Sequence, residues 1–313
     1  VSSASSMTAG RIVLAAAFLA TAVAQCPKDW NPKRCLGSSG KLATGSQVPY
    51  EQEKIVWQTG MTGHSHYTID PAKTALFVID PQYTYAKCPP TQSGQIPVEG
   101  LVQSPSDPDF KGHSPLCCDK FYPAVQQQNR LAEAARAKGM KVFLHAHIYR
   151  DTDGDGKVDN CGRLCDYDVL GWAGWPEAWN LWNEAFPWHE MVFAPDDPQG
   201  FRPDRQEDYY CEKSTFSAMT EPVVAELKAQ GIDTVVVTGF MTQYCSVTTS
   251  RHAHDLGFKV VFVQDANDGP ILQELLSGID ENAAIPFHLG IAVADVISTA
   301  DFLANLDDKK TEL

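Results

Sequence analysis

The chain has 313 residues, 43% of them hydrophobic, and its 25 basic and 39 acidic residues give a formal net charge of −14 at pH 7. This length and apolar content allow one large hydrophobic core or two smaller ones. The acidic balance repels nucleic acid and anionic membrane surfaces, which excludes a nucleic-acid partner.

Residues 7–24 have the pattern of a secretory signal peptide. They contain one arginine, a short apolar run and a small-x-small ending at Ala22 and Ala24, so that cleavage would expose Gln25. The alternative is a membrane anchor, but the apolar run is shorter than the roughly 20 residues that a span needs. We therefore expect residues 1–24 to be signal peptide and upstream residues, and the mature protein to be secreted, extracellular and without membrane contact.

Nine cysteines fit an exported protein, and if they are oxidised, eight could form up to four disulfides and leave one free thiol. No pair has the CxxC spacing that structural zinc sites favour. Connectivity cannot be read from spacing, but the plausible pairs are Cys26 with Cys35, Cys88 with Cys117 or Cys118, and Cys161 with Cys165.

In chain order, residues 25–70 are rich in Pro, Gly, Ser and Lys and predict an irregular extension. Continuous apolar runs then predict buried parallel strands at 74–79, 141–147, 233–239 and 259–265, and a weaker one at 290–295. Helical patterns fall between and after them, at 122–139, 221–231, 243–257 and 295–306.

This alternation predicts an α/β fold: a doubly wound, Rossmann-like, mostly parallel sheet with helices on both faces. One domain accounts for residues 71–307, with insertions at about 83–121 and 148–210. In such sheets ligands bind beyond the carboxyl ends of the strands, where both insertions emerge. We expect the insertions to shape the pocket.

Two side chains at this edge of the sheet suggest chemistry. Cys245 lies at the start of a predicted helix, where free N–H groups and the helix dipole favour a thiolate and lower the thiol pKa. Asp80 ends the first predicted strand on the same edge. Alone, each has an ordinary alternative, because Cys245 could be a small buried hydrophobe or a disulfide partner and Asp80 could cap a turn.

Three stretches carry a family resemblance: FVIDPQ at 77–82, EKSTFSAM at 212–219, and the long segment 235–266 around Cys245. They resemble the signature segments of the isochorismatase-like, or nicotinamidase-type, cysteine hydrolases, and the similarity spans most of 74–306. The resemblance implies Asp80 as base, Lys213 as the stabilising lysine and Cys245 as nucleophile.

The same resemblance implies an oxyanion site formed by the backbone N–H groups of Met241 and Cys245, with a cis peptide bond between Phe240 and Met241. It implies hydrolysis of a C–N bond in a small amide, ureide or nicotinamide-like substrate, because true isochorismatases typically lack the cysteine. The residues expected in the substrate pocket are Gln82, His147, Phe216 and Tyr244. For Phe216 the alternative is core packing.

No cofactor is needed for this chemistry. Nicotinamidases often bind a metal through an Asp-x-His element at the end of the second strand, but here that place reads HAHIYR, 145–150. His145 and His147 would point to one face, so a metal site stays open, but we favour a pocket-lining role for His147 and expect no catalytic metal.

The next segment, DTDGDGKVD at 151–159, resembles part of an EF-hand loop without its bidentate glutamate. A solvated acidic turn is the alternative, yet carboxylates this close repel one another unless a cation lies among them. We expect structural calcium held by Asp151, Asp153, Asp155 and Asp159.

Residues 171–188 hold five of the seven tryptophans. They could form an aromatic lid over a substrate pocket, a helix packed on the core, or the contact of a homo-oligomer, which relatives commonly form. Two other functions therefore stay open: an extracellular isochorismatase-type hydrolase, and a non-catalytic secreted protein that binds a ligand through this stretch. The latter would tolerate loss of Cys245 and could pair it with Cys211.

Overall fold

The computed structural model describes residues 69–86, 114, 116–160, 181–270 and 278–307. The chain divides into two units, 1–49 and 50–313, and every described residue lies in the second. The expected signal peptide, the extension up to residue 68 and most of the insertion at 83–121 lie outside the described residues. Within the described part, no helix has both the length and the apolar character needed to cross a bilayer.

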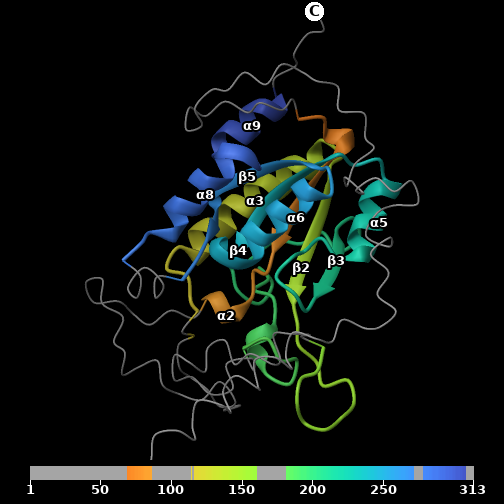
Figure 1. Ribbon diagram of the computed structural model, residues 1–313, viewed down its shortest axis with the longest axis vertical. Coiled ribbons are helices and arrows are strands. Elements are labelled where there is room, and N and C mark those ends of the chain that lie inside the picture. Colours follow the sequence, from red (N-terminus) through yellow and green to blue (C-terminus); the bar gives the residue numbers. More distant parts are fainter. Residues whose placement is uncertain (1–68, 87–113, 115, 161–180, 271–277, 308–313) are drawn as a thin grey trace, which may run out of the picture. The chain divides into compact units, whose positions relative to one another are not determined.

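The core of the fold is a six-stranded parallel sheet in the order β3-β2-β1-β4-β5-β6 (Figure 1). Every residue of β1 and of β4 is buried, which explains their continuous apolar sequences, since both faces of these central strands are covered. The strands are β1 Thr74–Ile79, β2 Lys141–His147, β3 Tyr209–Lys213, β4 Thr234–Phe240, β5 Lys259–Asp268 and β6 Asp295–Ile297.

Helices cover both faces of the sheet, as the sequence predicts (Figure 1). On one face, residues of α3 and α9 share a hydrophobic cluster with Leu76 and Val78; on the other, residues of α5, α6 and α8 share a cluster with Phe77 and Val237. The longer helices are α3 Phe121–Ala137, α5 Glu221–Ala229, α6 Val247–Asp255, α8 Glu281–Ala292 and α9 Thr299–Asp307. The short helical turns are η2 Pro71–Lys73, α2 Tyr83–Ala86, η6 Pro187–His189 and η7 Thr242–Ser246.

The C-terminal part differs from the prediction. The strand expected at 290–295 is wrong, because residues 290–292 end α8, a helix that the sequence analysis did not find. The Asp280 side chain caps α8 by accepting a hydrogen bond from the Ala283 N–H, and Leu289 is one of the buried residues of this helix. The helix expected over 295–306 begins instead with strand β6, and α9 starts at Thr299.

Strand β3 was also not predicted, and its first two residues fall in what the sequence suggested was an insertion. It lies at the edge of the sheet, and its residues alternate between partly buried and exposed positions until Lys213, which is buried. Because an edge strand is partly exposed to solvent, its sequence lacks the continuous apolar run that identifies the buried central strands.

The cysteines depart from the expected pattern of a single free thiol. Cys117 is disulfide-bonded, whereas Cys118, Cys211 and Cys245 are free. With these three cysteines free, at most three disulfides can form among the nine cysteines, fewer than the four that the sequence allowed. Cys118 and Cys245 lie in core clusters on opposite faces of the sheet, which keeps their sulfurs apart.

Candidate active site

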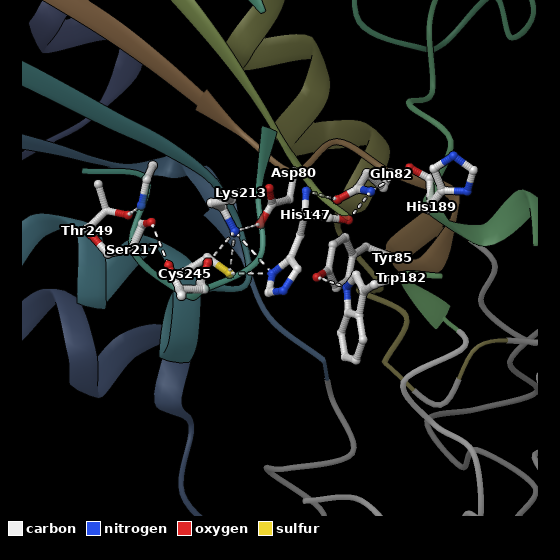
Figure 2. Close-up of polar contacts among 12 residues, drawn as sticks. Asp80, Gln82, Tyr85, His147, Trp182, His189, Lys213, Ser217, Cys245 and Thr249 are labelled. Carbon is white, nitrogen blue, oxygen red and sulfur yellow. Dashed lines mark hydrogen bonds and ion pairs between the residues drawn. The ribbon is translucent and has the colours of Figure 1, made fainter. Parts of the chain in front are cut away.

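Four polar side chains meet where four neighbouring strands end. Lys213 and His147 are the last residues of β3 and β2, Asp80 directly follows β1, and Cys245 follows β4 within the π-helical turn η7. The strand order reverses between β1 and β4, so the group lies at the topological switch point of the sheet, where ligands bind in doubly wound folds. Figure 2 shows these side chains turned toward one another.

The Lys213 ammonium group is the centre of this cluster. Its Nζ lies 2.7 Å from Oδ2 of Asp80, 3.3 Å from Sγ of Cys245 and 3.2 Å from the Thr215 carbonyl oxygen. It also lies 3.2 Å from Nδ1 of His147. Asp80, His147, Lys213 and Cys245 are all buried, at most 4% exposed, so the lysine charge is balanced by the Asp80 carboxylate rather than by solvent.

Burial shifts the protonation equilibria of the cluster. Burial, together with the Asp80 charge and against the opposing effect of Lys213, raises the pKa of the Cys245 thiol to about 12. The expected lowering of this pKa by the helix terminus is therefore wrong, because the loss of solvation outweighs it. Burial also raises the pKa of Asp80, against the effect of Lys213, which makes the carboxylate a stronger base than an exposed aspartate.

The backbone around Asp80 and Cys245 is unusual. Asp80 has φ of +52°, a left-handed conformation that is uncommon outside glycine and is found at functional sites. The expected cis peptide bond between Phe240 and Met241 is present. It follows Gly239, which has φ of +133° and on which a Cβ would lie 2.1 Å from the Ile79 carbonyl oxygen. Only glycine therefore fits this close approach of β4 to β1.

Cys245 lies four residues beyond Met241, in η7. The Met241 carbonyl accepts hydrogen bonds from the N–H groups of Tyr244 and Ser246, which closes the turn tightly before α6 begins. Met241 and Cys245 therefore belong to the same turn of the backbone. Their role as oxyanion donors stays a prediction.

The side chain of Gln82, which we expected in the substrate pocket, forms hydrogen bonds to the backbone beside the cluster. Its amide Nε2 donates to the carbonyl oxygens of His147 and His189, and its Oε1 accepts the His147 N–H at 3.0 Å. Gln82 is fully buried, so this side chain locks the end of β2 to the segment after β1.

The other predicted pocket residues form an aromatic group beside the cluster. The Phe216 ring lies 5.3 Å from that of Tyr244 and 6.3 Å from that of His147, and both Phe216 and Tyr244 are partly exposed. The structure thus brings Phe216, Tyr244 and His147 together at the predicted site, while Phe216 also packs against the core.

Sequence reasoning missed three aromatic residues of the site: Tyr85, Tyr149 and Trp182. The Trp182 Nε1 donates to the Tyr85 hydroxyl at 2.8 Å, and the rings of Trp182 and Tyr149 lie 5.5 and 4.8 Å from that of His147. Trp182 belongs to the tryptophan-rich stretch, of which residues 171–180 lie outside the described part. That stretch was the available signal, but its contact with His147 depends on the tertiary structure.

The residues at the end of β2 do not fit the metal site of nicotinamidases. His145 is buried against Phe77 and Phe143, with ring centroids 4.6 and 6.4 Å away, and both of its ring nitrogens lack hydrogen-bond partners. Ligand atoms of Asp80, His147 and Cys245 do lie within 4.8 Å of one another, but the Lys213 ammonium already contacts all three. A metal ion there would have to displace this lysine.

In the acidic loop, the structure groups three of the four expected calcium ligands. Carboxylate oxygens of Asp151, Asp153 and Asp155 lie within 4.8 Å of one another. Asp159 is held differently, because its carboxylate accepts hydrogen bonds from the N–H and hydroxyl of Thr152.

Comparison with known proteins places this site in a family. Residues 74–273 match the model of the isochorismatase domain. The chain is 42% identical over 60 residues to nicotinamidase 3 of Arabidopsis thaliana, a match that spans 19% of this chain and 30% of that protein.

Among solved structures, the chain is similar to a cysteine hydrolase from Pseudomonas syringae pv. phaseolicola 1448A, with a TM-score of 0.56, 21% identity, and coverage of 78% of this chain and 96% of that one. A pyrazinamidase/nicotinamidase from Streptococcus mutans UA159 has a TM-score of 0.47 and 19% identity, with coverage of 72% and 99%. The likeness to the Pseudomonas syringae structure supports the fold, and the family match covers more than half of the sequence. The chain belongs to the isochorismatase family of hydrolases.

Proposed function

We propose that this protein hydrolyses a C–N bond in a small amide, ureide or nicotinamide-like compound through a thioester on Cys245. The observation that carries the proposal is the buried contact of Lys213 with both the Asp80 carboxylate and the Cys245 sulfur, at 2.7 and 3.3 Å. A thiol, a base and a fixed positive charge in one dry site are the components of nucleophilic catalysis by cysteine.

The first step is transfer of the thiol proton to Asp80. In the resting site the thiol keeps its proton, because burial raises the pKa of Cys245 to about 12. Transfer to Asp80 leaves the net charge of the cluster unchanged, since a thiolate replaces a carboxylate beside the Lys213 ammonium. Because the proton moves within the cluster, the buried site neither gains nor loses charge. The Cys245 thiol can therefore lose its proton as its sulfur attacks the substrate.

The thiolate then attacks the carbonyl carbon, and the oxyanion accepts hydrogen bonds from the N–H groups of Met241 and Cys245. Protonated Asp80 gives its proton to the nitrogen as the C–N bond breaks, which releases the amine and leaves the thioester. A water molecule loses a proton to Asp80 and attacks the thioester. The C–S bond breaks, and the proton returns to the sulfur.

The test is hydrolysis of a panel of small amides, ureides and ring carboxamides by the wild type and four variants. We expect Cys245→Ala to lower kcat/KM at least about 10³-fold and Asp80→Asn to lower it roughly 10²- to 10⁴-fold. Lys213→Met should also lower it, because it removes the charge that stabilises the thiolate. Cys211→Ala is the matched control, since Cys211 is also a free cysteine but only partly buried on the edge strand, and it should retain the wild-type rate.

Two further measurements separate this mechanism from others. Acid-quenched wild type should carry an acyl group on Cys245 by mass spectrometry. The rate should fall in acid with a midpoint above the ordinary aspartate pKa of 3.8, because Asp80 must be ionised to act as base and burial raises its pKa. An active Cys245→Ala variant would overturn the proposal.

We also propose that the mature protein is secreted. The signal-like segment 7–24 supports this, and so does the disulfide at Cys117, since disulfides persist in oxidising compartments. The alternative of a non-catalytic binding protein would be favoured by a Cys211–Cys245 disulfide, whereas both cysteines are free.

A further inference from the structure

The segment that follows β3 supplies one acceptor of the Lys213 ammonium group. The carbonyl oxygen of Thr215 lies 3.2 Å from Nζ of Lys213. An ammonium group has three protons, and its other neighbours are Asp80, Cys245 and His147. A carbonyl oxygen that holds one proton in a fixed place sets the rotation of the ammonium group, and therefore the direction of the two protons that remain.

The contact with Thr215 matters most after the proton transfer of the proposed mechanism. Once Asp80 has taken the proton from Cys245, its side chain is neutral and attracts the lysine less strongly. The Thr215 carbonyl oxygen does not change its charge, so it holds the ammonium group beside the new thiolate. The position of this carbonyl oxygen is thus important at the step in which Lys213 stabilises the sulfur.

The main chain around Thr215 does not fix this carbonyl oxygen. Residues 215–219 lie in an irregular segment between β3 and α5, and they form no backbone–backbone hydrogen bond with the described part of the chain. Thr215 is exposed, and its hydroxyl donates to the Ser217 carbonyl oxygen at 3.4 Å, within the same segment. The position of the segment therefore depends on side chains of another element.

That element is α6, the helix that follows the proposed nucleophile. Oγ1 of Thr249 accepts a hydrogen bond from the Ala218 N–H at 2.9 Å, and both residues are fully buried. Oγ of Ser217 lies 2.9 Å from Nδ1 of His252, but this histidine is exposed. Water can replace an exposed hydrogen bond, whereas a buried N–H that loses its acceptor stays unpaired. Thr249 is therefore the stronger anchor.

The same stretch of chain carries the sulfur and this anchor. The turn η7, which contains Cys245, leads directly into α6, and Thr249 lies four residues after Cys245, about one helical turn. Figure 2 shows Ser217 and Thr249 on one side of Cys245 and Lys213 on the other. From Thr249 the path runs through the Ala218 N–H and the segment back to the carbonyl oxygen that Lys213 contacts.

We propose that Thr249 is a positioning residue, whose hydroxyl anchors the segment 215–218 so that the Thr215 carbonyl oxygen keeps the Lys213 ammonium group directed toward Cys245. This inference rests on the proposed cysteine chemistry. Thr249 acts through the segment and not by contact with the substrate, so its loss should weaken the effect of the lysine without removing any reacting group.

The test measures how fast iodoacetamide alkylates Cys245, which mass spectrometry follows separately from the other cysteines. The thiolate forms a C–S bond and releases iodide, so the rate reports on the sulfur whether or not any amide is hydrolysed. Thr249→Val keeps the shape of threonine without its hydroxyl, and we expect it to slow alkylation roughly three- to tenfold. Thr249→Ser keeps the hydroxyl and should stay close to the wild-type rate.

Thr248→Val is the matched control. Thr248 is the preceding residue of α6, is partly exposed and makes no hydrogen bond to any described residue of the segment 215–219. The same chemical change on the same helix should therefore leave the alkylation rate unchanged. If Thr249→Val does not fold, Thr249→Ala removes the same acceptor with a smaller side chain and is held to the same expectation.

A double-mutant cycle with Lys213→Met separates positioning from general loosening of the site. If Thr249 acts through the lysine, adding Thr249→Val to Lys213→Met should change the alkylation rate by less than about twofold. A decrease of similar size in both backgrounds would show general loosening and overturn the inference. An unchanged rate in a folded Thr249→Val variant would overturn it as well, even if amides are hydrolysed.

The outcomes also distinguish this inference from the proposed hydrolysis. If the cycle gives the expected result in a protein that cleaves none of the amides, the role of Thr249 stands and the proposed reaction is overturned. A wild-type Cys245 that iodoacetamide does not alkylate would overturn both, because the inference requires a thiol that Lys213 activates.

Discussion

At the scale of single residues, His145 is a buried titratable group that the proposed mechanism does not use. It packs between Phe77 and Phe143, and neither ring nitrogen has a hydrogen-bond partner. Burial, with a smaller effect of Lys213, lowers the pKa of His145 from 6.5 to about 3. The imidazole therefore behaves as an aromatic core residue that resists protonation.

This predicts a loss of stability in acid. As the pH falls from 6.5 toward 3, the unfolded chain takes up a proton on His145 while the folded chain does not, so the free energy of unfolding decreases through this window. The full effect is on the order of 5 kcal/mol, at about 1.4 kcal/mol for each unit by which the His145 pKa is lowered. His145→Phe should remove this contribution, and urea unfolding at pH 7 and pH 4 measures it.

The comparison is between the two pH values within each variant, so that any steric cost of the larger ring cancels. His254→Phe, at an exposed position on α6, serves as the control and should keep the wild-type difference between pH 7 and pH 4. If His145→Phe keeps that difference as well, His145 does not contribute to the acid sensitivity.

At the scale of elements, the sequence predicts best where burial is complete. Strands β1, β2, β4 and β5 and helices α3 and α5 lie within a few residues of their predicted positions, because a continuous apolar run or a regular helical pattern is a local property. Helix α8 was missed because its sequence, ENAAIPFHLGIA, is apolar on most sides and contains Pro286. Such a sequence has no polar face from which a helical period can be read.

The acidic loop at the end of β2 gives a prediction about an element. The carboxylates of Asp151, Asp153 and Asp155 lie close together and are accessible, so calcium should bind there. Adding calcium to protein that EGTA has stripped of metal ions should therefore raise the midpoint of thermal unfolding. Calorimetric titration with CaCl₂ measures the binding, and MgCl₂ should give a weaker signal.

The matched comparison is between Asp153→Asn/Asp155→Asn and Asp196→Asn/Glu207→Gln, which remove the same charge from exposed positions elsewhere. Only the first pair should abolish calcium binding. Equal stabilisation of both variants by calcium would show that the effect comes from general screening of the acidic chain.

At the scale of the whole molecule, α8 presents an apolar surface. Phe287 and Ile291 are about half exposed and lie one turn apart on the helix, and Ile279 precedes it with similar exposure. Glu281 is the only charged residue of α8. Two copies of a chain with a net charge of −14 repel each other except where they meet through an uncharged surface, and this helix offers one.

We therefore predict that the chain forms a homo-oligomer, which the sequence left as one alternative, and that its copies meet through α8. Phe287→Glu/Ile291→Glu should shift the mass measured by light scattering toward that of the monomer, because it places like charges across the contact. Tyr210→Ser, which removes an exposed aromatic residue from β3, is the control and should leave the mass unchanged. A wild-type chain that is monomeric at high concentration would contradict the prediction.

The sequence by itself determined the parallel sheet and the family, and it pointed to Asp80, Lys213 and Cys245 as candidate site residues, because strand periodicity and short motifs depend on neighbouring residues. Only the tertiary structure decided that His147 faces Lys213, that Gln82 holds the backbone of His147, and that three cysteines stay free. It also reversed the expected direction of the Cys245 pKa shift. The physical reason is that hydrogen-bond partners and desolvation depend on which strand ends meet in space, and His147 and Lys213 are 66 positions apart in the chain.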